Sequence, residues 1–432
     1  MTINRREFLV RTALTGAVVG LAGTEVRAQD PAKAVSKQDK LNVAIVGVAN
    51  RGGDNLNEVS RLSTVNIVAL CDVDDNYLNG AAQRFPGATK YNDYRKMLAQ
   101  KDIDAVVIST PDHMHAPVTL AAMEAGHDVY CEKPLAHTVA EVRKVTETAR
   151  RLKRVTQMGT QIHATNNYRR VVEVIRSGAI GAVTETHSWA DKVWSGITPL
   201  PTTPPPPATF HWDLWEGKTS ALPYNASYVP ATWRGWWAWG GGTLADMACH
   251  HMDLPFWALN LDHPLTIMAE GPVVHSDIAP EWLIIHYEFP ARDTRPPVKV
   301  NWYNGGKRPP QFSQADVLPG WGDGTLFVGE KGMLLADYNR YVLLPEKDFT
   351  AFTPPKPYLP ESIGHHAEWV EACKNCGTTT CNFDYSGPLA ETVALGNVAY
   401  RTGKKLVWDA RKLKAANCPE AGAFLHPMRT RS

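Results

Sequence analysis

The residues with the clearest chemical potential are Asp246 and His250, which follow the glycine run Gly240–Gly242. A spacing of four residues places both on one face of a helix, so that the carboxylate and the imidazole can meet. A carboxylate partner fixes the tautomer of a histidine and raises its basicity, which a base that removes a hydroxyl proton requires. The spacing therefore predicts that Asp246 contacts and orients His250.

A second chemical feature is the glycine turn after the apolar segment 41–46. The turn reads Gly47-Val48-Ala49-Asn50-Arg51-Gly52, a variant of the dinucleotide fingerprint G-x-G-x-x-G with alanine at the second glycine. Gly47 permits a tight turn, Gly52 permits close packing of helix on strand, and the amide groups at the helix start face a pyrophosphate. The match gains weight because the next apolar segment, 65–71, ends at Asp72, where a carboxylate can bind the ribose of adenosine.

Asp72 also bears on the choice of dinucleotide. Its charge repels a 2′-phosphate, so NAD is favoured over NADP, but Arg51 could partly neutralise that repulsion and leaves NADP open. The structural alternative for Asp72 is a helix N-cap, because a helical pattern follows it directly.

The third chemical feature is Lys133, in the segment Tyr130-Cys131-Glu132-Lys133-Pro134-Leu135. Beside a cationic nicotinamide ring, the ammonium form of a lysine is disfavoured, so that the lysine can give or take a proton near neutral pH. The alternative is an ion pair of Glu132 and Lys133 on the surface. We predict that Lys133 lies where the dinucleotide and the substrate meet.

Alternating strands and helices are expected to position these residues. Strands are predicted at 41–46, 65–71, 105–110, 128–131 and 155–161, with helices between them, which indicates a parallel sheet. Thr110-Pro111-Asp112-His113-Met114-His115 follows one of these strands, at the sheet edge where open α/β sheets bind ligands. The predicted fold class is α/β, with a Rossmann dinucleotide-binding domain over residues 41–165.

Residues 166–425 are predicted to form a second, α+β domain. Its strands, expected at 265–271, 282–289, 298–303, 324–328 and 333–337, follow one another without helices. Such a succession implies a large, open and mostly antiparallel sheet. A helix at 389–400 is a candidate to pack back on the first domain.

Four segments together resemble the glucose–fructose oxidoreductase and inositol dehydrogenase (Gfo/Idh/MocA) family of NAD(P)-dependent enzymes. They are residues 44–47, 71–73, 110–116 and 132–134, and the resemblance extends over 41–425. It implies that residues 132–134 lie beside the nicotinamide, with a proline bond that is commonly cis, and that Lys133 contacts substrate and shifts protons. It also implies that Asp246 and His250 are catalytic, with His250 as the general base and Asp246 as its orienting partner or a ligand of a substrate hydroxyl. It further implies that subunits pack through the second sheet as a homo-oligomer, either a dimer or a tetramer. The expected cofactor-binding residues are Gly47, Arg51, Gly52, Asp72, Thr110, Pro111, His115, Glu132 and Lys133.

The start of the second domain is rich in prolines and aromatic residues. Four consecutive prolines at 204–207 make a stiff loop, and tryptophans gather between Trp212 and Trp239. Aromatic faces near an arginine suit the faces of a sugar ring, although more than half of these rings are expected to be core or dimer contacts. The candidate substrate-binding residues are His163, His187, Arg234 and Trp236. We predict no metal site, and a metal joining the two histidines stays an open alternative.

Composition bears on partners and location. The chain has 45 Lys and Arg against 44 Asp and Glu, so no overall field attracts it to nucleic acid or to an anionic membrane. Residues 1–28 resemble a twin-arginine export signal, with Arg5-Arg6 ahead of a short apolar run, and residues 29–40 form a linker. We expect export to the periplasm and no membrane insertion after processing, because the run is too short to span a bilayer.

The chain contains seven cysteines, mostly in apolar contexts. Cys373, Cys376 and Cys381 lie close together in the sequence, but no second pair or well-spaced histidine completes a zinc motif. A disulfide within this group is left open.

These patterns predict an exported oxidoreductase whose NAD(P) takes a hydride from a hydroxyl of a sugar or glycoside. A free nicotinamide pool is not expected outside the cytoplasm, so the cofactor should stay bound and be regenerated in each cycle. One alternative is a glycoside hydrolase or lyase that uses transient oxidation. The other is a sugar-binding relative without chemistry, against which the presence of Lys133, Asp246 and His250 argues.

Overall fold

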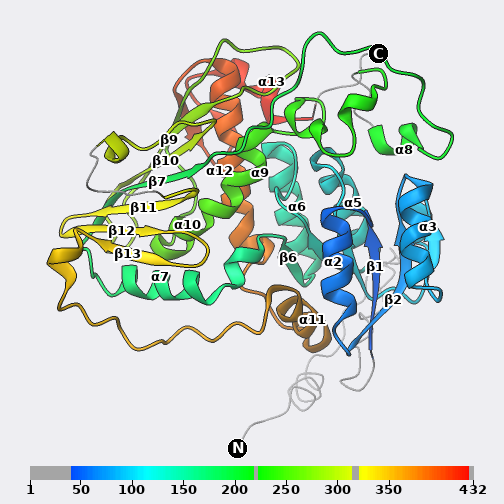
Figure 1. Ribbon diagram of the computed structural model, residues 1–432, viewed down its shortest axis with the longest axis horizontal. Coiled ribbons are helices and arrows are strands. Elements are labelled where there is room, and N and C mark those ends of the chain that lie inside the picture. The colour runs from blue at the N-terminus through cyan, green and yellow to red at the C-terminus, as the bar shows by residue number, and fades with distance from the viewer. Residues whose placement is uncertain (1–39, 218–221, 314–320, 428–432) are drawn as a thin grey trace, which may run out of the picture. The chain divides into compact units, whose positions relative to one another are not determined.

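The computed structural model describes residues 40–217, 222–313 and 321–427 (Figure 1). The predicted export signal, residues 1–28, lies outside these residues, as does nearly all of the predicted linker. In the described ranges, no helix combines the length and the apolar character that crossing a bilayer requires.

The first domain is built on a parallel sheet that has six strands in the described part of the chain, in the order β3-β2-β1-β4-β5-β6. Apart from the edge strand β3, these strands are buried over most of their length, as expected where helices cover both faces. The order reverses between β1 and β4, and the carboxyl ends of these strands border the crevice where such sheets bind dinucleotides. The strands are β1 (Leu41–Val46), β2 (Val65–Cys71), β3 (Thr89–Tyr91), β4 (Ala105–Ile108), β5 (Asp128–Cys131) and β6 (Thr156–Met158).

Helices alternate with these strands, as the sequence predicts. They are α2 (Arg51–Ser60), α3 (Asp75–Arg84), α4 (Tyr94–Met97), α5 (Asp112–Glu124) and α6 (Val139–Leu152). α5 begins at Asp112, because Pro111 has the extended conformation of an N-cap, and Pro117 is accommodated inside the helix. Asp112 to His115 therefore lie in the first turn of a helix and not in a loop.

The second domain holds a mixed sheet with nine strands among the described residues, in the order β13-β12-β11-β7-β10-β9-β8-β14-β15. Neighbouring strands are antiparallel, as predicted, apart from the parallel pair of β7 and β10. Alternate residues of β9 are buried, which is typical of a strand in such a sheet. The strands are β7 (Val183–Ala190), β8 (Thr266–Glu270), β9 (Leu283–Phe289), β10 (Val298–Asn304), β11 (Gly324–Gly329), β12 (Gly332–Ala336), β13 (Tyr341–Leu344), β14 (Leu406–Asp409) and β15 (Lys414–Ala415).

Helices of the second domain connect this sheet with the first domain. They are α7 (Asn166–Arg176), α8 (Trp212–Glu216), α9 (Gly242–His251), α10 (Asp253–Leu259), α11 (His365–Asn375), α12 (Phe383–Thr402) and α13 (Gly422–Leu425). α12 packs against both β8 and α6, and Figure 1 shows it next to α9. The guanidinium of Arg143 on α6 donates to Glu391 on α12 at 2.8 and 3.0 Å. α9, which carries Asp246 and His250, is thereby held close to the Rossmann domain.

Candidate active site

The glycine turn after β1 has the close packing that a dinucleotide site needs. Gly47 has a φ of +83°, and a Cβ added there would lie 2.6 Å from the carbonyl oxygen of Ser109. A Cβ on Gly52 would lie 2.1 Å from the carbonyl oxygen of Gly47. Only glycine fits at either position, so α2 approaches the end of β1 closely and its first turn faces the crevice.

Asp72, directly after β2, joins the glycine turn to the next strand. Its carboxylate accepts hydrogen bonds from the backbone N–H groups of Val48 at 2.9 Å and of Asp74 at 3.0 Å. The helix N-cap is Asp74, which accepts from Asn76 N–H, so the capping alternative does not apply to Asp72. Burial raises the pKa of Asp72, and the two N–H groups oppose that rise. Asp72 lines the crevice, where it can reach a ribose.

The side chain of Arg51 is paired with Glu132. Its Nε donates to Glu132 Oε1 at 3.0 Å, and Asn55 and Gln161 donate to the same oxygen at 2.9 and 2.6 Å. Glu132 is buried, so the alternative of a surface ion pair between Glu132 and Lys133 is wrong. With Arg51 paired in this way, the charge of Asp72 keeps the preference for NAD.

Lys133 forms an ion pair between the first domain and Asp246 of the second domain. Its Nζ donates to Asp246 Oδ1 at 2.7 Å and to the Asp246 carbonyl oxygen at 2.5 Å. The Lys133–Pro134 peptide bond is cis. His115 on α5 lies between the carbonyl oxygens of Thr110, 2.8 Å from Nε2, and Pro134, 2.5 Å from Nδ1. The histidine thus fixes the segment that carries Lys133 relative to the end of β4.

The carboxylate of Asp246 lies among four cationic or N–H groups. Besides Lys133, its Oδ1 accepts from Arg234 Nε at 3.2 Å, while Oδ2 accepts from the indole of Trp194 at 2.6 Å and lies 3.4 Å from Lys192 Nζ. Burial alone would raise the pKa of Asp246, but the charges of Lys133, Arg234 and Lys192 outweigh it and hold this pKa well below its usual range. Asp246 is therefore an anion that neutralises a group of cations.

The predicted contact between Asp246 and His250 is not formed. Both residues lie on α9, which starts at Gly242 in a left-handed conformation with φ of +66°. The Asp246 carboxylate points to its cationic partners, and His250 Nδ1 is buried without a hydrogen-bond partner in the described structure. Burial, with the nearby charge of Lys133, lowers the pKa of His250 well below its usual value, so the ring is neutral.

Most of the residues described above border one cavity of about 1480 Å³. Pockets for single small molecules have volumes of roughly 300–1,000 Å³, so this cavity is large enough for a dinucleotide with a second ligand. The predicted site residues that line it are Gly47, Arg51, Asp72, Thr110, Pro111, His115, Glu132, Lys133, Arg234, Asp246 and His250.

Comparison with known proteins agrees with this arrangement. Residues 41–160 match the model described as "Oxidoreductase family, NAD-binding Rossmann fold", and residues 168–293 match "Oxidoreductase family, C-terminal alpha/beta domain", the two domains of the Gfo/Idh/MocA proteins. The chain belongs to this family. Its first domain is the NAD-binding domain, and its second domain is the α/β domain that follows it in other Gfo/Idh/MocA proteins.

Two curated Gfo/Idh/MocA relatives differ in their named activities. A "Glycosyl hydrolase family 109 protein" of Shewanella pealeana is 31% identical over 202 residues, which cover 42% of this chain and 44% of that protein. An "Inositol 2-dehydrogenase" of Salmonella typhimurium is 34% identical over 150 residues, 34% of this chain and 45% of that protein. This chain thus matches less than half of the length of either relative.

Solved structures share the fold over most of the chain. The WlbA dehydrogenase of Bordetella pertussis, in complex with NADH and UDP-GlcNAcA, has a TM-score of 0.63 at 16% identity and covers 86% of this chain and 98% of its own. The aldose-aldose oxidoreductase of Caulobacter crescentus, complexed with glycerol, has a TM-score of 0.59 at 16% identity and covers 85% of this chain and 100% of its own.

Four predicted site residues of this Gfo/Idh/MocA protein do not border the cavity. Gly52, the last residue of the glycine turn, packs closely against Gly47. His187 on β7 is bonded to the Tyr303 hydroxyl at 2.9 Å, inside the sheet. Trp236 is 3% exposed in a cluster of aromatic side chains, so it cannot stack on a sugar. The fourth residue, His163, belongs to a separate buried group.

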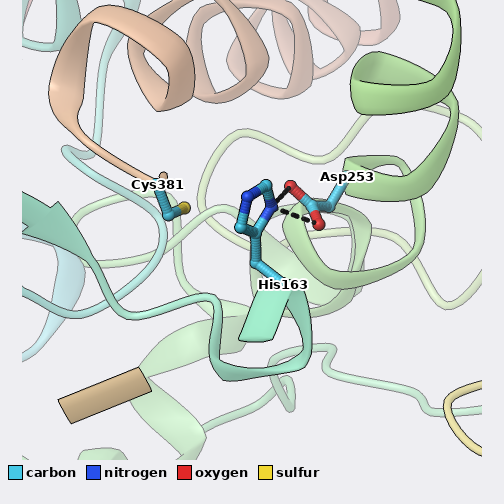
Figure 2. A group of neighbouring side chains, drawn as sticks. All are labelled: His163, Asp253 and Cys381. Carbon is cyan, nitrogen blue, oxygen red and sulfur yellow. Dashed lines mark hydrogen bonds and ion pairs between the residues drawn. The ribbon is translucent and has the colours of Figure 1, made fainter. Parts of the chain in front are cut away.

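His163 bonds through Nδ1 to both carboxylate oxygens of Asp253, at 2.9 and 3.0 Å, and stacks on Trp257. Cys381 lies near it, and the potential ligand atoms of His163, Asp253 and Cys381 are within 4.8 Å of one another. Figure 2 shows the imidazole ring of His163 between Asp253 and Cys381. His187 is not part of this group, and its Nδ1 is bonded to the Tyr303 hydroxyl.

The cysteine group likewise contains no cross-link. Cys373, Cys376 and Cys381 are all free thiols, and only Cys376 of the three is exposed. Cys381 precedes α12, whereas the other two lie on or directly after α11.

Sequence reasoning did not single out Asp112, Lys192 and Trp194, which border the cavity close to Asp246. Asp112 stands inside the motif that places His115, and its position at the end of β4 was a usable signal. The guanidinium carbon of Arg234 lies 5.3 Å from the ring centroid of Trp194 and 4.3 Å from that of Trp233. Arg234 thus contacts both indole rings. Lys192 and Trp194 follow β7 in an irregular segment, and no spacing pattern in the sequence connects them to Asp246.

Proposed function

We propose that this protein is an NAD-dependent oxidoreductase that removes a hydride from a hydroxyl-bearing carbon of a sugar or glycoside and keeps its cofactor bound. The observation that carries the proposal is the meeting of Lys133 with Asp246, beside His250, in the same cavity as Gly47 and Asp72. Groups that handle a proton and groups that hold a dinucleotide thus border one space. Proteins of this family bind NAD, which would be the hydride acceptor.

We assign the role of general base toward a substrate hydroxyl to His250, which borders the same cavity as Lys133 and Asp246. Burial and the charge of Lys133 keep its imidazole neutral, so the ring can accept a proton. The excess of cations around Asp246, from Lys133, Arg234 and Lys192, stabilises negative charge on the substrate oxygen as the proton leaves. Asp246 in turn holds Lys133 in place through two hydrogen bonds.

The roles are tested by Lys133→Met and His250→Ala. Each variant should fold and retain NAD but lose turnover by about 10²–10⁴-fold, the usual contribution of a positioned acid or base. The assay is a screen of sugars and glycosides with the purified protein, read as reduced nicotinamide absorbance and as product by mass spectrometry. Lys144→Met is the matched control, because Lys144 is an exposed lysine of the same cavity and is not among the cations that act on Asp246. Near-normal turnover of either test variant would show the role assignment to be wrong.

A second candidate is a net redox-neutral cleavage of a glycoside, in which transient oxidation loosens the glycosidic bond and is then reversed. The relative named as a family 109 glycosyl hydrolase favours this candidate. The two are separated by the product: an oxidoreductase yields a keto-sugar, whereas the cleavage yields a free sugar and no net change in NAD. A sugar that binds without any product would favour the third candidate, a binding protein.

Export and tight retention of the cofactor complete the proposal. The signal-like residues 1–28 support periplasmic export, where a cofactor that left the site would not be replaced. Native mass spectrometry of protein purified without added nucleotide should find one NAD per chain, and NADP or an empty site would contradict this part. The same spectra report whether the protein is a dimer or a tetramer.

A further inference from the structure

A segment of the second domain, residues 207–217, lies against the first domain at the carboxyl end of β2. We call it the strap. The backbone N–H of Asp75 donates to the Thr209 carbonyl at 2.9 Å, and the N–H of His211 donates to the Val73 carbonyl at 2.9 Å. These two bonds form an antiparallel bridge between Asp74 and Phe210. The bridge begins two residues after Asp72.

Side chains strengthen this first anchor. Asn76 Nδ2 donates to Thr209 Oγ1 at 3.3 Å, and the His211 ring lies 3.3 Å from the carboxylate of Asp75. The strap is thus bound to the start of α3 by groups from both backbone and side chains.

A second anchor holds the other end of the strap on α5. His113 Nε2 is 2.8 Å from the carbonyl oxygen of Trp215, and the two rings are in contact with centroids 5.1 Å apart. Burial lowers the pKa of His113 to about 3, so the neutral ring donates this bond. The two anchors follow β2 and β4, which are the neighbours of β1 on either side. The strap therefore crosses in front of the glycine turn at the end of β1.

The inner side of the strap forms part of the cavity wall. Phe210, Leu214 and Trp215 border the same cavity as Gly47 and Asp72. In Figure 1, α8, which is part of the strap, lies near α3 and α5. In this fold the adenosine half of a dinucleotide occupies the space beside Asp72 and the glycine turn.

The strap is also rigid by construction. Prolines 204–207 lead into it, and their fixed φ angles reduce the freedom that the segment loses when it docks. Trp215 stacks on Trp212 and packs against Trp239 within a buried aromatic cluster. Removing the strap from the cavity would disturb this packing along with the two anchors.

We propose that the strap covers the adenosine half of bound NAD and is the element that prevents its release between turnovers. The inference rests on the proposed function, because it assumes that NAD occupies this cavity as the recycled cofactor. NAD can leave only when the bridge to Val73 and Asp75 opens. The cofactor is thus retained by a segment of the second domain of the same chain.

A cross-link through the bridge tests this directly. Asp74 and Phe210 are opposite each other without being hydrogen-bonded to each other, a pairing with a Cα separation of about 4.5 Å, which a disulfide can span. We would combine Asp74→Cys and Phe210→Cys with Cys376→Ser, because Cys376 is the exposed cysteine among the described residues. The assay follows exchange of bound NAD for isotope-labelled NAD by mass spectrometry, with and without reductant.

The oxidised protein should exchange NAD at least tenfold more slowly than the same protein after reduction. Since both forms have the same sequence, loss of the Asp74 cap or of the Phe210 ring affects them equally. Equal exchange rates with the disulfide verified would overturn the inference.

A second test weakens the first anchor of the strap with one variant and compares it with a control variant. His211 has φ of −83°, close to the angle of proline, so His211→Pro removes its N–H with little change of backbone. The substitution also removes the contact of the His211 ring with Asp75, so we expect NAD release to become at least about two- to tenfold faster, the effect of one lost hydrogen bond. Ala208→Pro is the matched control, because the N–H of Ala208 takes no part in the bridge. Unchanged release from His211→Pro would overturn the inference, whatever substrate the enzyme turns over, and absence of turnover with strap-dependent release would overturn only the proposed function.

Discussion

Asp112 offers the sharpest test of the electrostatics of this cavity. It is the first residue of α5 and only 5% exposed, and it borders the cavity near Arg234, Lys133 and Asp246. Burial raises the pKa of Asp112 to about 7, with Asp246 adding to the rise, while the two cations and a bond from Gly241 N–H oppose it. The substitution Asp112→Asn keeps the shape and the acceptor oxygen but cannot ionise.

The raised pKa fixes both the sign and the size of the effect on stability. Between the ordinary pKa of 3.8 and the folded value of about 7, the native state holds a proton that the unfolded chain has released. Native stability therefore falls as pH rises through this window. At about 1.36 kcal/mol per pKa unit the full loss is about 4 kcal/mol, of which about 2 to 3 kcal/mol falls between pH 5 and pH 8.

The measurement is the free energy of unfolding in denaturant for nucleotide-free protein at several pH values from 5 to 8. Relative to Asp112→Asn, the wild type should become about 2 to 3 kcal/mol less stable across this range, because all other titrating groups cancel in the difference. Asp102→Asn, at an exposed position, is the control and should follow the wild type. A difference between wild type and Asp112→Asn that does not change with pH would refute the reasoning.

Two other substitutions probe the cofactor end of the cavity and the contact between the domains. Asp72→Ser should weaken NAD binding by about ten- to hundredfold, the range of a lost charged hydrogen bond, and reduce the preference over NADP in calorimetric titrations; an unchanged preference would contradict the role of its charge. Arg143→Met should lower the free energy of unfolding by about 3–5 kcal/mol, because it leaves the buried Glu391 without its guanidinium. Adding Glu391→Gln should recover much of this loss, and a double variant no more stable than the single one would argue against the ion pair as the cause.

Much of the fold follows from local patterns in the sequence. The first domain was predictable because buried parallel strands read as short apolar runs, and because Gly47, Gly52 and Asp72 mark the positions where a dinucleotide site limits side-chain size and charge. Lys133, Asp246 and His250 were likewise found from their motifs, and the structure brings all three to one cavity. The α/β class and the mostly antiparallel second sheet are confirmed.

The pairing of these groups was decided only by tertiary structure. A helix spacing of four residues allows Asp246 to meet His250, but the carboxylate turns to Lys133, Arg234, Lys192 and Trp194 because docking of the domains brings those donors closer. Lys133 is 113 residues away from Asp246, and no local rule connects them. The same holds for the strap, which reaches Asp75 from a proline-rich loop. The sequence by itself identified the candidate site residues, whereas the contact between domains determined their partners, because charge and hydrogen bonding act on distances that only the folded chain sets.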